Sequence, residues 1–117
     1  MNLTDENRRF VNEKRIESMK PGACVRNCSR GGLVDEQAVA AACRRARLGG
    51  YGADVLEQEP PAADDPILDM ANALIVPHIG TATTQTRYAM RELAVQNLVA
   101  VISGQTTPTC LNPEVLG

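Results

Sequence analysis

Short apolar runs alternate along this chain with stretches in which apolar residues recur every three or four positions. The apolar runs lie at residues 23–28, 52–56 and 73–76, and each ends in a polar or glycine-containing turn. Residues 36–47 have apolar side chains at helical spacing: Val39, Ala42, Cys43 and Ala46. Short apolar runs of this kind are typical of strands in a parallel sheet that helices cover. The pattern therefore predicts an α/β fold, with parallel strands and flanking helices.

A short helix is predicted before the first strand. Asn12 is a good N-cap residue, and Val11 and Ile16 are placed around it as a hydrophobic staple. Pro21-Gly22 stops this helix. The polar residues 3–10 are predicted to form a loop.

Two further helices follow from caps and periodicity. Asp35 can cap a helix over residues 36–47, and Gly49-Gly50 ends it. A long helix is predicted from about residue 83 to residue 103, and Gly104 ends it. Its apolar stripe consists of Met90, Leu93, Ala94, Leu98, Val101 and Ile102.

Composition limits the classes of function. The chain has 117 residues, the length of one domain, and with only three aromatic residues its core must be aliphatic. The net charge is −2 with both signs well mixed, so no basic stripe indicates nucleic-acid binding. No apolar run reaches the ~20 residues of a membrane span, and the first residues do not resemble a signal peptide. A cytoplasmic location is the expectation.

The four cysteines predict no metal site and no disulfide. They stand at positions 24, 28, 43 and 110, without C-x-x-C spacing, and the chain has a single histidine. On one strand, Cys24 and Cys28 would lie ~13 Å apart, beyond the ~7 Å between the Cα atoms of a disulfide. Reduced thiols that pack as small hydrophobes are expected.

Three polar side chains each follow a separate predicted strand: Arg30, Glu59 and His78. In a parallel sheet, groups beyond the carboxyl ends of adjacent strands meet at one edge. An arginine binds a carboxylate with two donors, a histidine transfers protons near neutral pH, and a glutamate favours its protonated form. From spacing alone, a plainer alternative stays open: a histidine bound to a backbone carbonyl, a surface arginine and a solvated loop carboxylate.

Three segments resemble the D-isomer-specific 2-hydroxyacid dehydrogenases. They are M-K-P-G-A-C-V-R-N-C-S-R-G-G-L-V-D-E-Q-A (19–38), G-A-D-V-L-E-Q-E-P (52–60) and N-A-L-I-V-P-H-I-G-T-A-T (72–83). The pattern H-I-G-T-A-T-x-x-T-R is similar to the glyoxylate/hydroxypyruvate reductase branch. The resemblance implies an NAD(P)-dependent oxidoreductase that transfers hydride between a cofactor, NAD or NADP, and a small 2-oxo or 2-hydroxy acid.

The same resemblance implies roles for individual residues. Arg30 matches the family arginine that binds the substrate's carboxylate and carbonyl. His78 matches the acid–base histidine that protonates the carbonyl oxygen, and Glu59 matches the carboxylate paired with it. Asp54 matches the aspartate at the nicotinamide end of the cofactor. The implied cofactor-binding residues are Cys28, Ser29, Arg30, Asp54, His78 and Gly80.

The family's phosphate-binding fingerprint does not occur in this sequence. No G-x-G-x-x-G is present, and the family carries it, together with the residue that selects NAD or NADP, upstream of the matching segments. We therefore expect residues 1–104 to be the C-terminal half of a Rossmann-like nucleotide-binding domain and residues 105–117 to be a tail. A truncated product, an incomplete gene model and a split subunit all fit this expectation. Arg26 and Cys28 depart from the apolar and small residues that are usual there.

The expected partners follow from the incomplete domain. They are a small 2-oxo or 2-hydroxy acid, the missing N-terminal half of the enzyme, and further copies of the chain, because the stripe on the long helix would be partly bare. Nucleic acid and membranes are not expected partners. Alone, the chain is expected to be inactive. A non-enzymatic module like the related co-repressors, which keep the same three residues, and a fragment without function remain alternatives.

Overall fold

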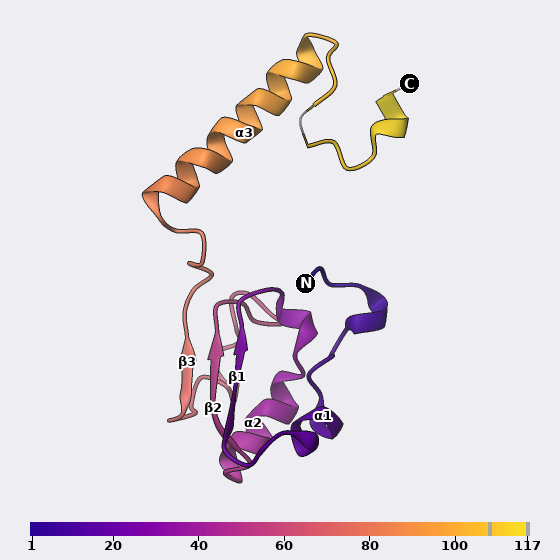
Figure 1. Cartoon of the computed structure of the whole chain (residues 1–117). Helices are drawn as coiled ribbons and strands as arrows, with labels where there is room; N and C mark the ends of the chain where they lie inside the picture. Colours follow the sequence, from indigo (N-terminus) through magenta and orange to yellow (C-terminus); the bar gives the residue numbers. More distant parts are fainter. Residues whose placement is uncertain (108, 117) are drawn as a thin grey trace. The chain divides into compact units, whose positions relative to one another are not determined.

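The computed structural model describes residues 1–107 and 109–116 (Figure 1). The chain divides into two compact units, residues 1–80 and residues 81–117, which we describe separately. The first unit contains a three-stranded sheet in the order β1-β2-β3. The strands are β1 (Ala23–Asn27), β2 (Leu48–Ala53) and β3 (Ala73–Ile75), and both pairs are parallel. The predicted α/β fold with parallel strands is confirmed.

Two helices cover one face of this sheet. They are α1 (Glu13–Ser18) and α2 (Glu36–Arg44), and Figure 1 shows them on the same side. The predicted caps are present, since Asn12 accepts a hydrogen bond from the Arg15 amide and Asp35 accepts one from the Ala38 amide, both at 3.1 Å. The largest fully buried side chains are Ile16, Leu48, Ile67 and Val39, and all four belong to one apolar cluster. This apolar layer fixes the strands whose ends carry the candidate site.

The junction between α2 and β2 differs from the prediction. The helix was expected to reach residue 47 and the strand to begin at residue 52, but α2 ends at Arg44 and β2 begins at Leu48. Ala46 takes the left-handed conformation, with φ 56°, that a glycine usually takes after a helix. It lies outside the helix and is exposed, unlike the other members of the predicted apolar stripe.

The two glycines expected to end α2 lie inside β2 instead. A Cβ on Gly49 would lie 2.5 Å from the Gly22 carbonyl oxygen, and one on Gly50 would lie 3.0 Å from the Asn72 carbonyl oxygen. Backbone therefore leaves no room for a side chain at Gly49 and little room at Gly50, and neither position ends the helix.

The start of the chain is also more ordered than predicted. The expected loop over residues 3–10 contains a 3₁₀ turn, Asp5–Asn7. The Asn7 side chain accepts a hydrogen bond from the Thr4 amide at 2.8 Å and donates one to the Asn2 carbonyl at 2.7 Å. An asparagine that bonds to nearby backbone in this way stabilises a turn without any apolar periodicity.

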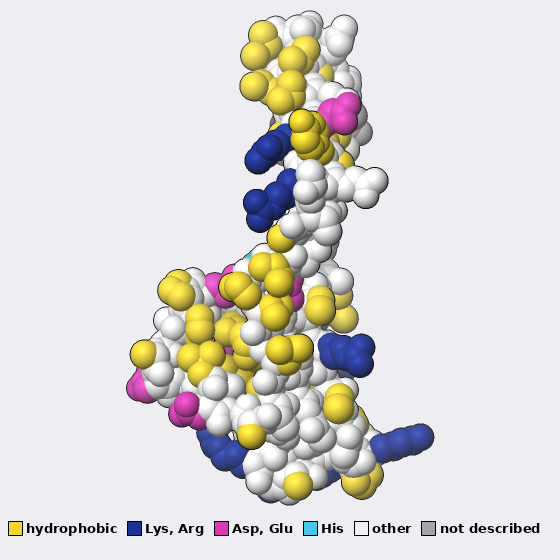
Figure 2. Space-filling model, turned by 90° about the vertical axis from the view of Figure 1, so that its left-hand side faces the viewer, with side chains coloured by type: hydrophobic (Ala, Val, Ile, Leu, Met, Phe, Trp, Pro, Cys, Tyr) yellow, Lys and Arg dark blue, Asp and Glu magenta, His cyan; other side chains and the backbone are white. Residues whose placement is uncertain are grey.

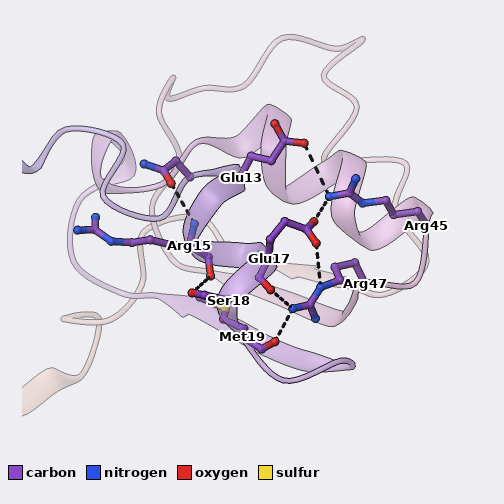
Figure 3. Close-up of polar contacts among 8 residues, drawn as sticks. Glu13, Arg15, Glu17, Ser18, Met19, Arg45 and Arg47 are labelled. Atoms are coloured by element: carbon purple, nitrogen blue, oxygen red, sulfur yellow. Dashed lines mark hydrogen bonds and ion pairs between the residues drawn. The ribbon is translucent and has the colours of Figure 1, made fainter.

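A polar cluster ties the end of α1 to the residues after α2 (Figure 3). The Arg47 guanidinium donates hydrogen bonds to the backbone carbonyls of Glu17, at 2.8 Å, and of Met19. The Glu17 carboxylate also pairs with Arg45, which lies 3.9 Å from Glu13. A cation that binds the last carbonyls of a helix satisfies acceptors left free there. This cluster holds α1 beside α2.

The other face of the sheet is open. Cys24 and Arg26 of β1 are exposed, and Leu74 of β3 is 70% exposed. Figure 2, which views the β3 side, shows apolar side chains gathered over this unit. Arg26 therefore escapes the desolvation expected for a charge in a covered sheet, because its side chain lies on the open face.

The second unit contains the predicted long helix, α3 (Thr84–Ile102), with Thr83 as N-cap, followed by a 3₁₀ turn, Pro113–Leu116. Ala100 is the buried residue of α3 among those described, and apolar side chains are exposed around the helix. They are Tyr88, Met90, Leu93, Val95, Leu98, Val99, Val101 and Ile102. No helix of the described residues is both long and apolar enough to cross a membrane. The domain limit at residue 104 and self-association through this helix stay predictions.

Candidate active site

The carboxyl ends of the three strands are joined by backbone hydrogen bonds at one edge of the sheet. The Asp54 amide donates to the Asn27 carbonyl, and the Val76 amide donates to the Ala53 carbonyl, both at 2.9 Å. The segments that follow the strands, and that carry the predicted site residues, therefore begin side by side. This is the edge at which open parallel sheets bind ligands.

His78 and Glu59 form the central contact of this edge. The Nδ1 atom of His78 lies 2.9 Å from Oε2 of Glu59, and Oε1 of Glu59 accepts a hydrogen bond from the Leu56 amide at 2.9 Å. The hydrogen bond to His78, followed by that to Leu56, lowers the pKa of the Glu59 carboxyl. Among the described residues, no hydrogen bond engages Nε2 of His78, which leaves this atom free for proton transfer.

Asp54 holds the turn that presents His78. Its Oδ1 accepts a hydrogen bond from the Ile79 amide at 2.6 Å, and its Oδ2 accepts one from the Gly80 amide at 2.8 Å. A Cβ on Gly80 would lie 2.7 Å from Oδ2, so the carboxylate fits closely against a residue without a side chain. His78 itself has φ 52°, a conformation that histidine adopts more readily than most residues. The buried Asp54 thus stabilises the turn, a role that the sequence did not suggest; its contact with a cofactor stays a prediction.

Arg30 is joined to this edge through its backbone. Among the described residues, its guanidinium forms one hydrogen bond, to the Ser29 carbonyl at 2.6 Å, and it is exposed. The next residue, Gly31, lies so close to the Leu56–Glu57 peptide that a Cβ would overlap the Leu56 carbonyl oxygen. The structure therefore brings Glu59 and His78 into contact and places the Arg30 turn against the segment that carries Glu59, while the Arg30 side chain points to solvent.

Asn27 shapes the Arg30 turn, and sequence reasoning missed it. Its side chain is 4% exposed. Its Nδ2 donates to the Arg30 carbonyl at 2.9 Å, and its Oδ1 accepts from the Ser29 amide at 3.2 Å. The available signal was a polar amide at the end of an apolar strand, directly before a turn, where asparagine bonds to the backbone two residues on.

Replacing Asn27 by leucine is expected to lower the free energy of unfolding by about 1–3 kcal/mol, because two polar groups of the turn lose their partner. Urea denaturation followed by circular dichroism measures the change. Gln37→Leu, an exposed amide on α2, is the matched control and is expected to have little effect. Equal unfolding midpoints for the Asn27 and Gln37 variants would contradict the role of this amide.

Comparison with known proteins identifies the family. The NAD-binding domain of the D-isomer specific 2-hydroxyacid dehydrogenases matches residues 1–80, more than half of the chain. This chain belongs to that family. The resemblance noted in three sequence segments is thereby confirmed, and the parallel sheet with its helices is part of the family's Rossmann-like NAD-binding domain.

Individual proteins match most of the chain. A glyoxylate/hydroxypyruvate reductase B of Shigella boydii is 44% identical over 113 residues, which are 97% of this chain and 35% of that protein. A solved structure of a protein from Thermus thermophilus has a TM-score of 0.89 at 42% identity, over 95% of this chain and 35% of the other. An NADPH-dependent glyoxylate/hydroxypyruvate reductase from Sinorhizobium meliloti, solved with NADP and malonate, has a TM-score of 0.82 at 33% identity, over 88% of this chain and 32% of the other.

The chain spans about a third of the length of these relatives. The family domain implies a nicotinamide dinucleotide as cofactor. In the unit that holds the site, both helices begin with acidic residues: Glu13 in α1, and the Asp35 cap with Glu36 in α2. Acidic side chains at a helix N-terminus repel phosphate, so neither helix fits the cofactor's diphosphate.

The edge of the sheet does fit the other end of a dinucleotide. Cys28 and Gly80 are small and exposed there, and Ser29 is half-buried. Nε2 of the nearby His78 has no hydrogen-bond partner in the part of the chain that the structure describes. A flat ring can approach closely where side chains are small. The residues present therefore fit the nicotinamide end of the family's cofactor. Among the described residues, no three His, Cys, Asp or Glu side chains are grouped so that they could hold a metal ion.

Proposed function

We propose that this chain supplies the proton-transfer and substrate-anchoring residues of an NAD(P)-dependent reductase that acts on small 2-oxo acids. The observation that supports this most directly is the His78–Glu59 pair. Nδ1 of His78 contacts the Glu59 carboxylate, and Nε2 has no hydrogen-bond partner among residues 1–107 and 109–116. A histidine held in this way is oriented for acid–base catalysis at its second nitrogen. The names of the relatives favour glyoxylate or hydroxypyruvate as the acid.

In this proposal, each residue has a distinct task. A bound reduced nicotinamide supplies the hydride. Nε2 of protonated His78 donates a proton to the carbonyl oxygen of the 2-oxo acid, and the Glu59 carboxylate stabilises the imidazolium. The exposed Arg30 guanidinium binds the substrate carboxylate with two parallel hydrogen bonds. Asp54 keeps His78 in place by holding the Ile79 and Gly80 amides.

The proposed cofactor site lies at the nicotinamide end. Cys28, Ser29, Arg30, Asp54, His78 and Gly80 are the residues that would line it. The proposed partners are a 2-oxo acid, the part of an enzyme that binds the cofactor's diphosphate, and further copies of the chain. The residues present fit both NAD and NADP. Reductase activity measured with NADH and with NADPH distinguishes the two cofactors.

The test is a chimera in which this chain replaces the matching third of the Shigella boydii reductase. We expect it to oxidise NADPH or NADH when glyoxylate or hydroxypyruvate is added. Arg30→Lys and Arg30→Ala are both expected to lower kcat/KM for the oxo acid about tenfold or more, since each hydrogen bond to a charged group contributes about 1.5–3 kcal/mol. The KM for the cofactor is expected to change much less.

Arg44, exposed on α2 away from the strand ends, provides the matched control. Arg44→Ala is expected to keep kcat/KM for both oxo acids within twofold of the unmutated chimera, about the scale of a neutral surface change. Unchanged oxo-acid kinetics in both Arg30 variants would refute Arg30 as the substrate anchor. A folded chimera without any reductase activity would refute the proposed function.

A further inference from the structure

The segment that carries Glu59 has no helix or strand to fix it, and hydrogen bonds hold it instead. The Leu56 amide donates to the Glu59 carboxylate at 2.9 Å, and the Glu57 amide donates to Oε1 of Glu36 at 2.9 Å. Two consecutive amides thus bind two different carboxylates. Only the φ and ψ rotations of Leu56 separate these two amides, so a hydrogen bond that fixes the Glu57 amide restricts the orientations open to the Leu56 amide. The Glu36 contact therefore bears on where the Glu59 side chain points.

Glu36 is an unusual residue for its position. It stands in the first turn of α2 with 6% of its surface exposed. Burial raises the pKa of its carboxyl, and the negative side chains of Asp65, Glu57 and Glu59 raise it further, while the hydrogen bond from the Glu57 amide lowers it. A buried carboxyl is costly unless its hydrogen bond compensates. Its bond to Glu57 is thus the feature that offsets this cost.

Further contacts around Glu57 also restrict the Leu56–Glu57 segment. Its side-chain Oε1 lies 3.4 Å from Nη2 of Arg9, whose Nη1 lies 3.8 Å from the Asp35 carboxylate. The backbone of Gly31 presses on the Leu56–Glu57 peptide from the Arg30 turn. Glu36, Arg9 and Gly31 therefore contact the Leu56–Glu57 segment from three different parts of the chain, and Glu36 is the one that binds the Glu57 amide itself.

We propose that Glu36 is a positioning residue for the acid–base pair: by accepting the Glu57 amide proton, it fixes the turn that aims Glu59 at His78. This inference rests on the proposed function. Glu36 touches neither the reacting atoms nor His78, and it acts through the Leu56–Glu57 peptide. Its simpler role, a negative charge at the N-terminus of α2, concerns the helix alone and leaves Glu59 unaffected.

Two substitutions separate the hydrogen bond from the charge. Glu36→Gln removes the charge and keeps an oxygen that accepts the Glu57 amide proton. Glu36→Met keeps the length and volume of the side chain and offers no comparable acceptor. If Glu36 positions Glu59, the contact between Glu59 and His78 is kept in the glutamine variant and weakened in the methionine variant. If only the charge at the helix end matters, the two variants behave alike.

The readout is His78 itself, the only histidine of the 117-residue chain, so its imidazole NMR signals need no assignment by further mutation. The charged group in contact with its ring is the Glu59 carboxylate, 2.9 Å from Nδ1. Without the Glu59 contact, His78 should lose its proton at a lower pH, because a nearby carboxylate favours the imidazolium. Glu59→Gln defines the full change that loss of this carboxylate produces.

In the full chain, Glu36→Met is expected to shift the His78 titration by a large share of the shift seen in Glu59→Gln. Glu36→Gln is expected to leave the His78 titration unchanged. Glu13→Met is the matched control, because Glu13 is the exposed acidic residue that begins α1 as Glu36 begins α2. Circular dichroism checks that each variant is folded. Should Glu36→Met unfold the chain, Glu36→Ser, which shortens the acceptor beyond reach of Glu57, takes its place.

The outcomes distinguish the inference from the proposed function. If the His78 titration is shifted in Glu59→Gln but matches the native chain in Glu36→Met, the positioning role is overturned and the proposed function is unaffected. Equal shifts in Glu36→Met and Glu36→Gln also overturn it, in favour of the charge at the helix end. An unshifted Glu59→Gln contradicts the His78–Glu59 pair and with it both proposals.

Discussion

Replacing His78 by asparagine in the chimeric reductase is expected to lower kcat for glyoxylate or hydroxypyruvate about 10²–10⁴-fold, the usual contribution of a general acid. Asparagine is chosen because it tolerates a positive φ, as the 52° at His78 requires, so the turn held by Asp54 stays intact. Steady-state oxidation of the reduced cofactor measures the loss. Binding of the cofactor is expected to change far less, since the missing group acts on the carbonyl oxygen.

The pH dependence gives an independent check of the same residue pair. The pKa of Glu59 is lowered, so its carboxylate stays ionised until the pH falls below the ordinary range of a glutamate. Its support for the imidazolium is therefore present at neutral pH and is lost on acidification. In Glu59→Gln, the decline of the reduction rate with rising pH is expected to begin at a lower pH. For the His78→Asn chimera of the first prediction, an unchanged kcat would show that His78 is not the general acid.

Replacing Gly31 by alanine is expected to be among the most damaging changes to stability. The new Cβ would overlap the backbone of Leu56 and Glu57, which no flexible side chain can relieve. Overpacking of this kind typically costs about 1–3 kcal/mol, and backbone overlap places this variant at the upper end or beyond. Urea denaturation measures the loss, and the His78 titration shows whether Glu59 has moved with the displaced segment.

Gly52→Ala is the control for that prediction. Gly52 lies in β2, where the nearest atom to a new Cβ would be Cγ of Arg26 at 3.7 Å, an ordinary van der Waals distance. This variant is expected to be neutral or slightly more stable, because alanine loses less conformational freedom than glycine on folding. Similar losses of stability for Gly31→Ala and Gly52→Ala would show that the close approach at Gly31 is not what matters.

Local signals predicted much of the fold. The N-caps Asn12 and Asp35 and the periodicity of α2 and α3 correctly predicted where helices begin, because these signals depend on neighbours within one turn. The predicted α2–β2 junction was wrong because Gly49 and Gly50 were interpreted as a helix end. Both lie in β2, where the backbone of Gly22 and Asn72, distant in sequence, approaches them closely. Such contacts leave no periodic trace in the sequence.

In the candidate site too, some residues could be predicted from the sequence and others could not. Arg30, Glu59 and His78 followed from their places after strands and from the family resemblance, and the structure shows His78 and Glu59 in contact. The residues that arrange this edge were not predicted as such. Asn27 and Glu36 act through hydrogen bonds to backbone amides or carbonyls. Any polar residue can make such bonds, so its type alone does not reveal which backbone group it meets.

The connection between β2 and β3 has a consequence for the order of folding. The strands β1 and β2 are joined through α2, whose turns form locally, whereas residues 54–72, all of them described, contain no helix or strand before β3. Closing such a connection costs chain entropy before any contact of β3 compensates, and pairings between distant segments form late. Glu59 lies in this connection and His78 lies beyond it, so the pair can form only when β3 has docked on β2. A chain that has folded β1, α2 and β2 would still be without its proton-transfer pair, which makes chemical competence the last property that this unit acquires as it folds.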